Sequence, residues 1–128
     1  MLGQAFYSLK ISFQPSIETF NAITTVLNVE VPLDNKFEKI PSIWEFTKTV
    51  SPEDNYFDFI NNFLDILENK YDQLKNIGIN RDDISIWFLY EYDQQCNMEF
   101  NPQRMKRLGE NQITLCISCY EADDFITF

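Results

Sequence analysis

Alternation of apolar and polar side chains predicts β-strands in three parts of the chain. Residues 6–13 and 113–119 alternate throughout, and each segment predicts a strand with one buried face. Residues 44–50 alternate in the same way and predict a strand at a sheet edge. Residues 84–92 are apolar almost without interruption, which is typical of a central strand. The predicted buried face of the first strand consists of Tyr7, Leu9, Ile11 and Phe13.

Apolar residues three and four positions apart predict three helices. The first covers residues 15–27, and Pro15 suits its first turn because the missing N–H has no partner there. The second is the longest and covers residues 51–78. The third covers residues 101–109, with an Asn-Pro start and an end at Gly109.

The long helix has the clearest signals of the three. Ser51 is its expected cap, and Gly78 is expected to end it in the left-handed conformation. Its apolar stripe consists of Phe57, Ile60, Leu64, Leu67, Tyr71 and Leu74. Carboxylates away from this stripe are expected to face solvent, and they are Asp54, Asp58, Asp65 and Asp72.

The order of these elements indicates the fold class. Residues 93–97 are typical of a turn, after which we expect residues 98–100 to return as a short hairpin strand. The order is then β-α-β-α-β-(β)-α-β. With 128 residues, 45% of them hydrophobic, the chain fits one domain spanning residues 1–128. We expect an α+β two-layer sandwich, a mostly antiparallel sheet with helices on one face.

The charge of the chain narrows the class of partner. Twenty Asp and Glu stand against ten Lys and Arg, and with no His the net charge is −10. Such a chain repels nucleic acid and anionic membranes and attracts basic proteins, although solubility alone explains the acidity equally well. The first residues lack the features of a signal peptide, so we expect none. The sequence contains no stretch of roughly 18 apolar residues and no disulfide pattern among its three cysteines. We therefore expect a cytoplasmic protein.

The groups needed for catalysis are scarce. Without His, neither a Ser-His-Asp nor a Cys-His arrangement can form, and three glycines cannot build a phosphate-binding loop. Cys116 and Cys119 have redox or zinc spacing, but residues three apart in a strand point to opposite faces. We expect no enzymatic activity, no cofactor and no metal. The alternative is a carboxylate-metal hydrolase built on Glu91, Asp93, Asp123 and Asp124.

Several segments are similar to those of one bacterial family. The first strand reads YSLKI, Trp44-x-Phe46 opens the second, and the long helix contains FINNFLDILENKYDQL. The segments IWFLYEY, FNPQRMKRLG and ITLCISCY follow. Over nearly its whole length the chain resembles the bacterial domain-of-unknown-function 4279 family. The resemblance implies a small cytoplasmic protein similar to the immunity proteins of polymorphic, contact-dependent toxin systems, which inhibit the toxin that their own cell delivers to its neighbours.

The resemblance also implies a partner, a cognate cytoplasmic toxin. We expect this toxin to be a nuclease, because an acidic inhibitor suits an active site that must be basic to hold phosphates. A housekeeping protein-binding adaptor is a further alternative. The residues expected to bind the toxin are Glu91, Tyr92, Asp93, Glu121, Asp123 and Asp124.

Overall fold

The computed structural model describes residues 5–33, 39–50, 57–92 and 98–121. The strands in these residues are β1 (Ala5–Ser12), β2 (Ile43–Val50), β3 (Ile84–Tyr92) and β4 (Thr114–Glu121). They form one sheet in the order β2-β1-β3-β4. β1 is antiparallel to both β2 and β3, whereas β3 and β4 are parallel.

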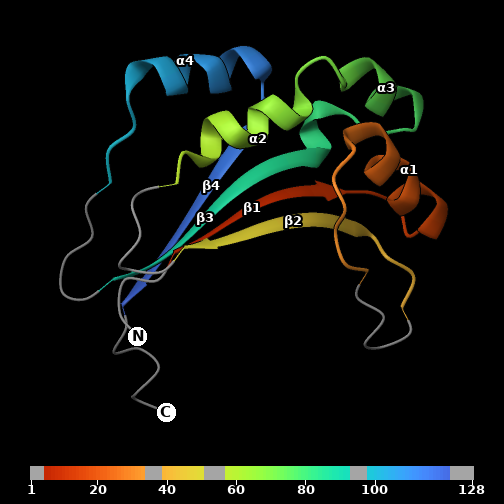
Figure 1. Ribbon diagram of the computed structural model, residues 1–128, viewed down its shortest axis with the longest axis horizontal. Coiled ribbons are helices and arrows are strands. Elements are labelled where there is room, and N and C mark those ends of the chain that lie inside the picture. Colours follow the sequence, from red (N-terminus) through yellow and green to blue (C-terminus); the bar gives the residue numbers. More distant parts are fainter. Residues whose placement is uncertain (1–4, 34–38, 51–56, 93–97, 122–128) are drawn as a thin grey trace.

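The helices lie on one face of this sheet (Figure 1). They are α1 (Ile17–Leu27), α2 (Phe59–Leu67), α3 (Tyr71–Asn76), the short 3₁₀ helix η1 (Arg81–Asp83) and α4 (Pro102–Asn111). α2 packs against α4, while α1 and α3 lie together at the other end of the sheet. The expected α+β class, with a mostly antiparallel sheet and its helices on one face, is confirmed.

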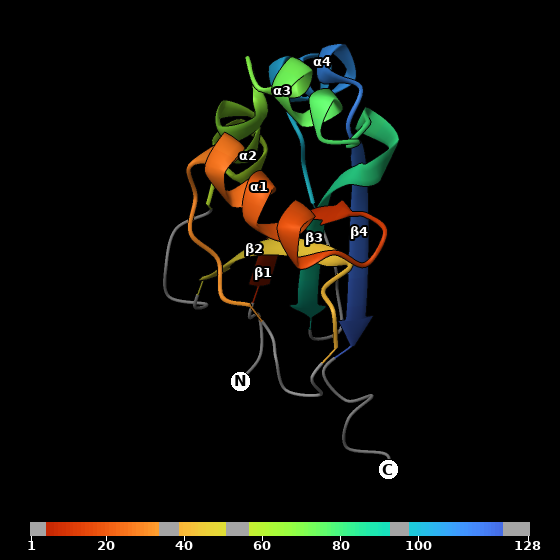
Figure 2. The same cartoon turned by 90° about the vertical axis from the view of Figure 1, so that its right-hand side faces the viewer.

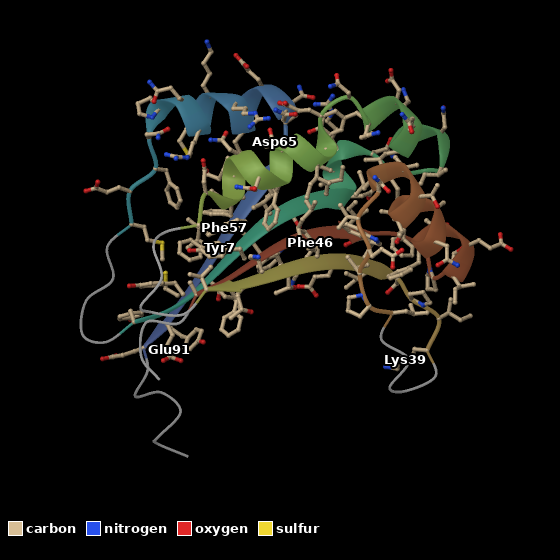
Figure 3. The ribbon with its side chains drawn as sticks, viewed as in Figure 1. Tyr7, Lys39, Phe46, Phe57, Asp65 and Glu91 are labelled. Atoms are coloured by element: carbon tan, nitrogen blue, oxygen red, sulfur yellow. The ribbon has the colours of Figure 1, made fainter. Side chains whose placement is uncertain are left out.

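The core lies between the sheet and the helices. Leu9 and Ile11 of β1 are completely buried, as their alternation predicted. Tyr7 stacks on Phe88, its neighbour in β3, with ring centroids 4.9 Å apart. Phe57 meets the same Tyr7 ring edge-on at 5.4 Å, below α2 (Figure 3). Helices α1 and α2 complete the core with Phe20, Ile23, Leu27, Phe59, Ile60, Phe63, Leu64 and Leu67.

Helix α1 starts slightly later than predicted. Ser16 is its cap, because its backbone is extended and its hydroxyl accepts the Thr19 N–H at 3.0 Å. Pro15 therefore precedes the cap instead of lying in the first turn. Asn28 ends the helix in the left-handed conformation, with a φ of 57°. Asn tolerates this conformation better than most residues because its short side chain bonds locally.

The predicted long helix is two helices. Its backbone leaves the helical conformation at Glu68, and Asn69 has a φ of 69° before α3 begins. Gly78 follows α3 with a φ of 89°, as predicted. The apolar stripe continues through the break, so its spacing did not reveal the interruption.

The start of α2 also differs from the prediction. Its cap is Asp58, whose carboxylate accepts the Asn61 backbone N–H at 3.4 Å. The predicted cap, Ser51, lies outside the described residues. Asp58 was expected to face solvent with the other carboxylates of this helix, but it is half-buried because Arg104 of α4 holds it.

The predicted hairpin after β3 is wrong. Residues 98–100 are not a strand, and the expected turn at residues 93–97 lies outside the described residues. In place of a hairpin strand, β4 lies beside β3 on the side away from β1 and runs parallel to it. A parallel neighbour requires a crossover long enough to return to the starting end of the sheet, and α4 lies within that crossover.

Helix α4 starts as predicted and ends later. The Asn101 side chain accepts the Arg104 N–H at 2.8 Å and caps the helix. Gly109 lies inside the helix, which ends at Gln112 with a φ of 58°. The extra length has a reason in the packing, because the side chain of Asn111 accepts a hydrogen bond from the Tyr71 hydroxyl and donates one to Glu68, both outside α4.

Candidate protein-binding site

The carboxyl ends of β3 and β4 bring three of the predicted partner-binding residues together. Because the two strands are parallel, both carboxyl ends lie at the same end of the sheet. In their register, Glu91 is opposite Tyr120 and Tyr92 is opposite Glu121. Figure 3 shows Glu91 at this end of the sheet, far from Lys39 at the other end. The remaining predicted residues, Asp93, Asp123 and Asp124, lie outside the described residues.

These neighbours divide between the two faces of the sheet. Side chains alternate along a strand, and Phe88 of β3 is buried beneath the helices. Tyr92 and its neighbour Glu121 therefore lie on the helix side, whereas Glu91 and Tyr120 lie on the opposite face. The rim formed by the carboxyl ends of β3 and β4 thus carries a carboxylate and a tyrosine on each face. It consists of Glu91, Tyr92, Tyr120 and Glu121.

Glu91 and Tyr120 also interact directly. Burial, the charge of Glu91 and a hydrogen bond with Glu91 raise the pKa of the Tyr120 hydroxyl. The hydroxyl is therefore protonated at neutral pH and donates to the Glu91 carboxylate. An ionised carboxylate can accept several hydrogen bonds, so Glu91 can also accept bonds from a cationic partner.

Strand β4 contributes residues that the sequence analysis did not assign to the site. Ile117 is 44% exposed although it is apolar, and Ser118 and Cys119 beside it are also exposed. The signal that pointed to them was present in the sequence: residues 114–120 contain no charged side chain. That signal was ambiguous, because an uncharged alternating strand fits the interior of a sheet as well as its edge.

A second group of charged residues joins α2 to α4 and serves packing. Arg107 Nη2 lies 2.6 Å from both Asp65 Oδ1 and Glu68 Oε1 (Asp65 is labelled in Figure 3). Arg104 Nε lies 2.8 Å from Asp58 Oδ1. Hydrogen bonds from Arg104 hold the pKa of Asp58 below its ordinary value. Both arginines are thus engaged by helix carboxylates and do not offset the charge at the ends of β3 and β4.

The described part of the chain contains side chains of the types that bind metal ions, and two cysteine thiols. Within it, no three His, Cys, Asp or Glu side chains are grouped to hold a metal ion. Cys116 is opposite Trp87 and Cys119 is opposite Tyr90, so the two thiols lie on opposite faces of β4, as predicted.

Other surface features lie away from the acidic rim. A cleft of about 570 Å³ lies beside Ser16 and Gly78, and another of about 570 Å³ lies beside residues 39–47. Glu91, Tyr92 and Glu121 line neither of them. In the residues that the structure describes, no helix combines the length and the apolar character that crossing a membrane requires.

Comparison of the chain with protein-family models, with curated proteins and with solved structures finds no match. Membership of the domain-of-unknown-function 4279 family stays a prediction from the sequence segments. What the site can do is inferred from the register, the charge and the exposure of β3 and β4.

Proposed function

We propose that this protein is a cytoplasmic immunity protein that binds a cognate nuclease toxin one-to-one and neutralises it. The observation that carries the proposal is the acidic and aromatic rim at the carboxyl ends of β3 and β4. A carboxylate and a tyrosine lie there on each face of the sheet, in a chain of net charge −10. The resemblance to immunity proteins supports the same function.

The rim has the chemistry to recognise a basic active site. A nuclease must hold phosphates with cationic groups, so its cleft attracts Glu91 and Glu121. Attraction over long range speeds the encounter, and the aromatic rings of Tyr92 and Tyr120 suit the role of anchors in the contact. Because these side chains stand on paired strands, little conformational freedom is lost when the complex forms. The protein acts by binding and not as an enzyme.

Co-expression with the product of the open reading frame immediately upstream tests the proposal. We expect a one-to-one complex in a pull-down and rescue of the cells from killing. Reversing two rim charges with Glu91→Lys/Glu121→Lys should abolish rescue. The matched control is Glu30→Lys/Asp82→Lys, which makes the same change of charge at exposed positions outside the rim.

Three results would contradict the proposal. The wild-type chain would fail to bind and to rescue, or the control would lose rescue as fully as the rim variant. Alternatively, calorimetry would show tight stoichiometric binding of Mg²⁺ or Mn²⁺, which the carboxylate-metal hydrolase predicts.

A further inference from the structure

We propose that the toxin contributes an extended segment that pairs with the outer edge of β4 as an additional strand of the sheet. This inference rests on the proposed function and specifies how the toxin is bound. β4 is the last strand of the sheet, and no strand in the described residues pairs with its outer edge. Figure 2 shows β4 as the outermost strand on one side of the sheet. Along such an edge, every second residue directs its backbone N–H and C=O outward, where a strand can bond them.

The two edge strands differ in whether they carry side chains that discourage pairing with another strand. β2, at the opposite edge, carries the charged residues Glu45 and Lys48. Glu45 also pairs with Lys10 of β1, with 3.8 Å between the Lys10 Nζ and the Glu45 carboxylate. β4 has neither charge nor proline from Thr114 to Tyr120. Charged side chains and prolines are the usual protection of an edge strand, so β4 is the edge that accepts another strand.

Exposure along β4 supports the same assignment. Phe88 and Ile117 are direct neighbours in the register of β3 and β4, and both lie on the helix side of the sheet. Phe88 is 6% exposed, whereas Ile117 is 44% exposed. The cover that the helices give to β3, and to Leu115 of β4, therefore does not extend to Ile117 in the described part of the chain. A side chain of an added strand, placed opposite Ile117, would shield it from water.

The charge pattern indicates which strand fits. The centre of β4 is uncharged, Glu121 ends this strand, and Glu91 lies beside that end in the neighbouring β3. A complementary segment is apolar where it meets Ile117 and basic where it reaches these two carboxylates. A second copy of this chain is disfavoured as the occupant, because it would bring together two chains of net charge −10.

The test places a charge on each edge in turn and measures binding to the toxin encoded upstream. Ile117→Lys gives β4 the protection that β2 already has, and we expect the Kd of the complex to rise at least about tenfold, mainly through faster dissociation. Thr49→Lys makes the same change of charge at an exposed position of β2 and should leave the Kd within about twofold. Ile117→Val keeps a β-branched apolar side chain and should also bind as wild type. Circular dichroism confirms that each variant is folded.

Amide hydrogen exchange supplies a readout specific to strand pairing. On binding the toxin, amides of residues 114–121 should gain protection, whereas those of residues 43–50 should not. The inference would be overturned if the wild type bound and rescued and the Ile117→Lys variant bound equally tightly. It would also be overturned if the gain in protection were confined to other elements. Either result would leave the proposed function standing. Failure of the wild type to bind or rescue would overturn both. A dimer of the unbound protein that Ile117→Lys dissociates would assign the edge to a second copy instead.

Discussion

At the scale of single residues, Arg107 of α4 binds two side chains of α2 and the side chain of the residue that caps its C-terminal end. It donates hydrogen bonds to Asn61 at 2.8 Å and to Asp65 and Glu68 at 2.6 Å. Asn111, one turn further along α4, donates to Glu68 at 2.8 Å. Hydrogen bonds from Arg107, and then from Asn111, hold the pKa of Glu68 below its ordinary value of 4.5. The charged form of Glu68 therefore stabilises the folded state.

This network predicts a loss of stability in acid. A carboxyl whose pKa is lower in the folded state stabilises the protein above its unfolded pKa, and loses that contribution as pH falls through the folded value. We expect the free energy of unfolding to be constant above about pH 5 and to fall below about pH 4.5, as Glu68 and Asp58 become protonated. Urea unfolding across this range measures it.

Arg107→Ala isolates the contribution of Glu68. This variant should be less stable than wild type at neutral pH and should show a shallower fall in acid. Lys106→Ala is the control, because Lys106 pairs only at 3.8 Å with Glu110 and both side chains are largely exposed. A fall as steep in Arg107→Ala as in wild type would contradict the assignment.

At the scale of elements, one hydrogen bond attaches α1 to the edge strand β2. Trp44 of β2 is completely buried, and its indole N–H donates to the Thr24 hydroxyl of α1 at 3.0 Å. A buried donor that loses its only acceptor pays for its desolvation without compensation. The position of α1 on the sheet is therefore tied to a polar contact as well as to its apolar face.

Thr24→Val tests this attachment. The substitution keeps the shape of the side chain and removes the acceptor, so we expect a loss of about 1–3 kcal/mol in the free energy of unfolding. Thr25→Val is the control, since Thr25 is exposed and its hydroxyl bonds only within α1, to the Asn21 carbonyl. Denaturant unfolding measures both variants. Equal losses would show that the hydroxyl of Thr24 does not hold α1 to β2.

At the scale of the whole molecule, the net charge of −10 governs encounter with a basic partner. Attraction between opposite charges raises the association rate, and salt screens it over a distance of about 10 Å at roughly 0.1 M. Affinity after contact depends more on the closely packed groups than on these distant charges. Long-range charge should therefore affect mainly the association rate, whereas strand pairing should affect mainly the dissociation rate.

The acidic residues after β4 provide the corresponding prediction. Asp123→Lys/Asp124→Lys should slow association with the toxin and flatten its dependence on salt, while the dissociation rate changes little. Stopped-flow measurements between about 50 and about 500 mM salt would show this. An unaltered association rate would remove these two residues from the encounter surface.

The elements themselves were determined by local sequence. Alternation located β1, β2 and β4, because a half-buried strand needs an apolar residue at every second position, and a nearly continuous apolar run located the central strand β3. Asn101 and Gly78 marked helix boundaries for equally local reasons, an amide that caps a first turn and a residue without a Cβ at positive φ. The acidic charge and the absence of His restricted the chemistry before any fold was known.

The pairing of these elements was decided only by the tertiary structure. Nothing in the spacing of β3 and β4 shows that they are parallel neighbours, since that depends on the crossover through α4. The ion pair between Glu68 and Arg107 depends in the same way on α4 packing beside α2. Periodicity reports which side of a segment is apolar, but the partner of each face and edge is set by contacts between residues far apart in the chain. The placement of Glu91 and Glu121 at the same end of the sheet, beside an uncharged edge, is a product of those contacts.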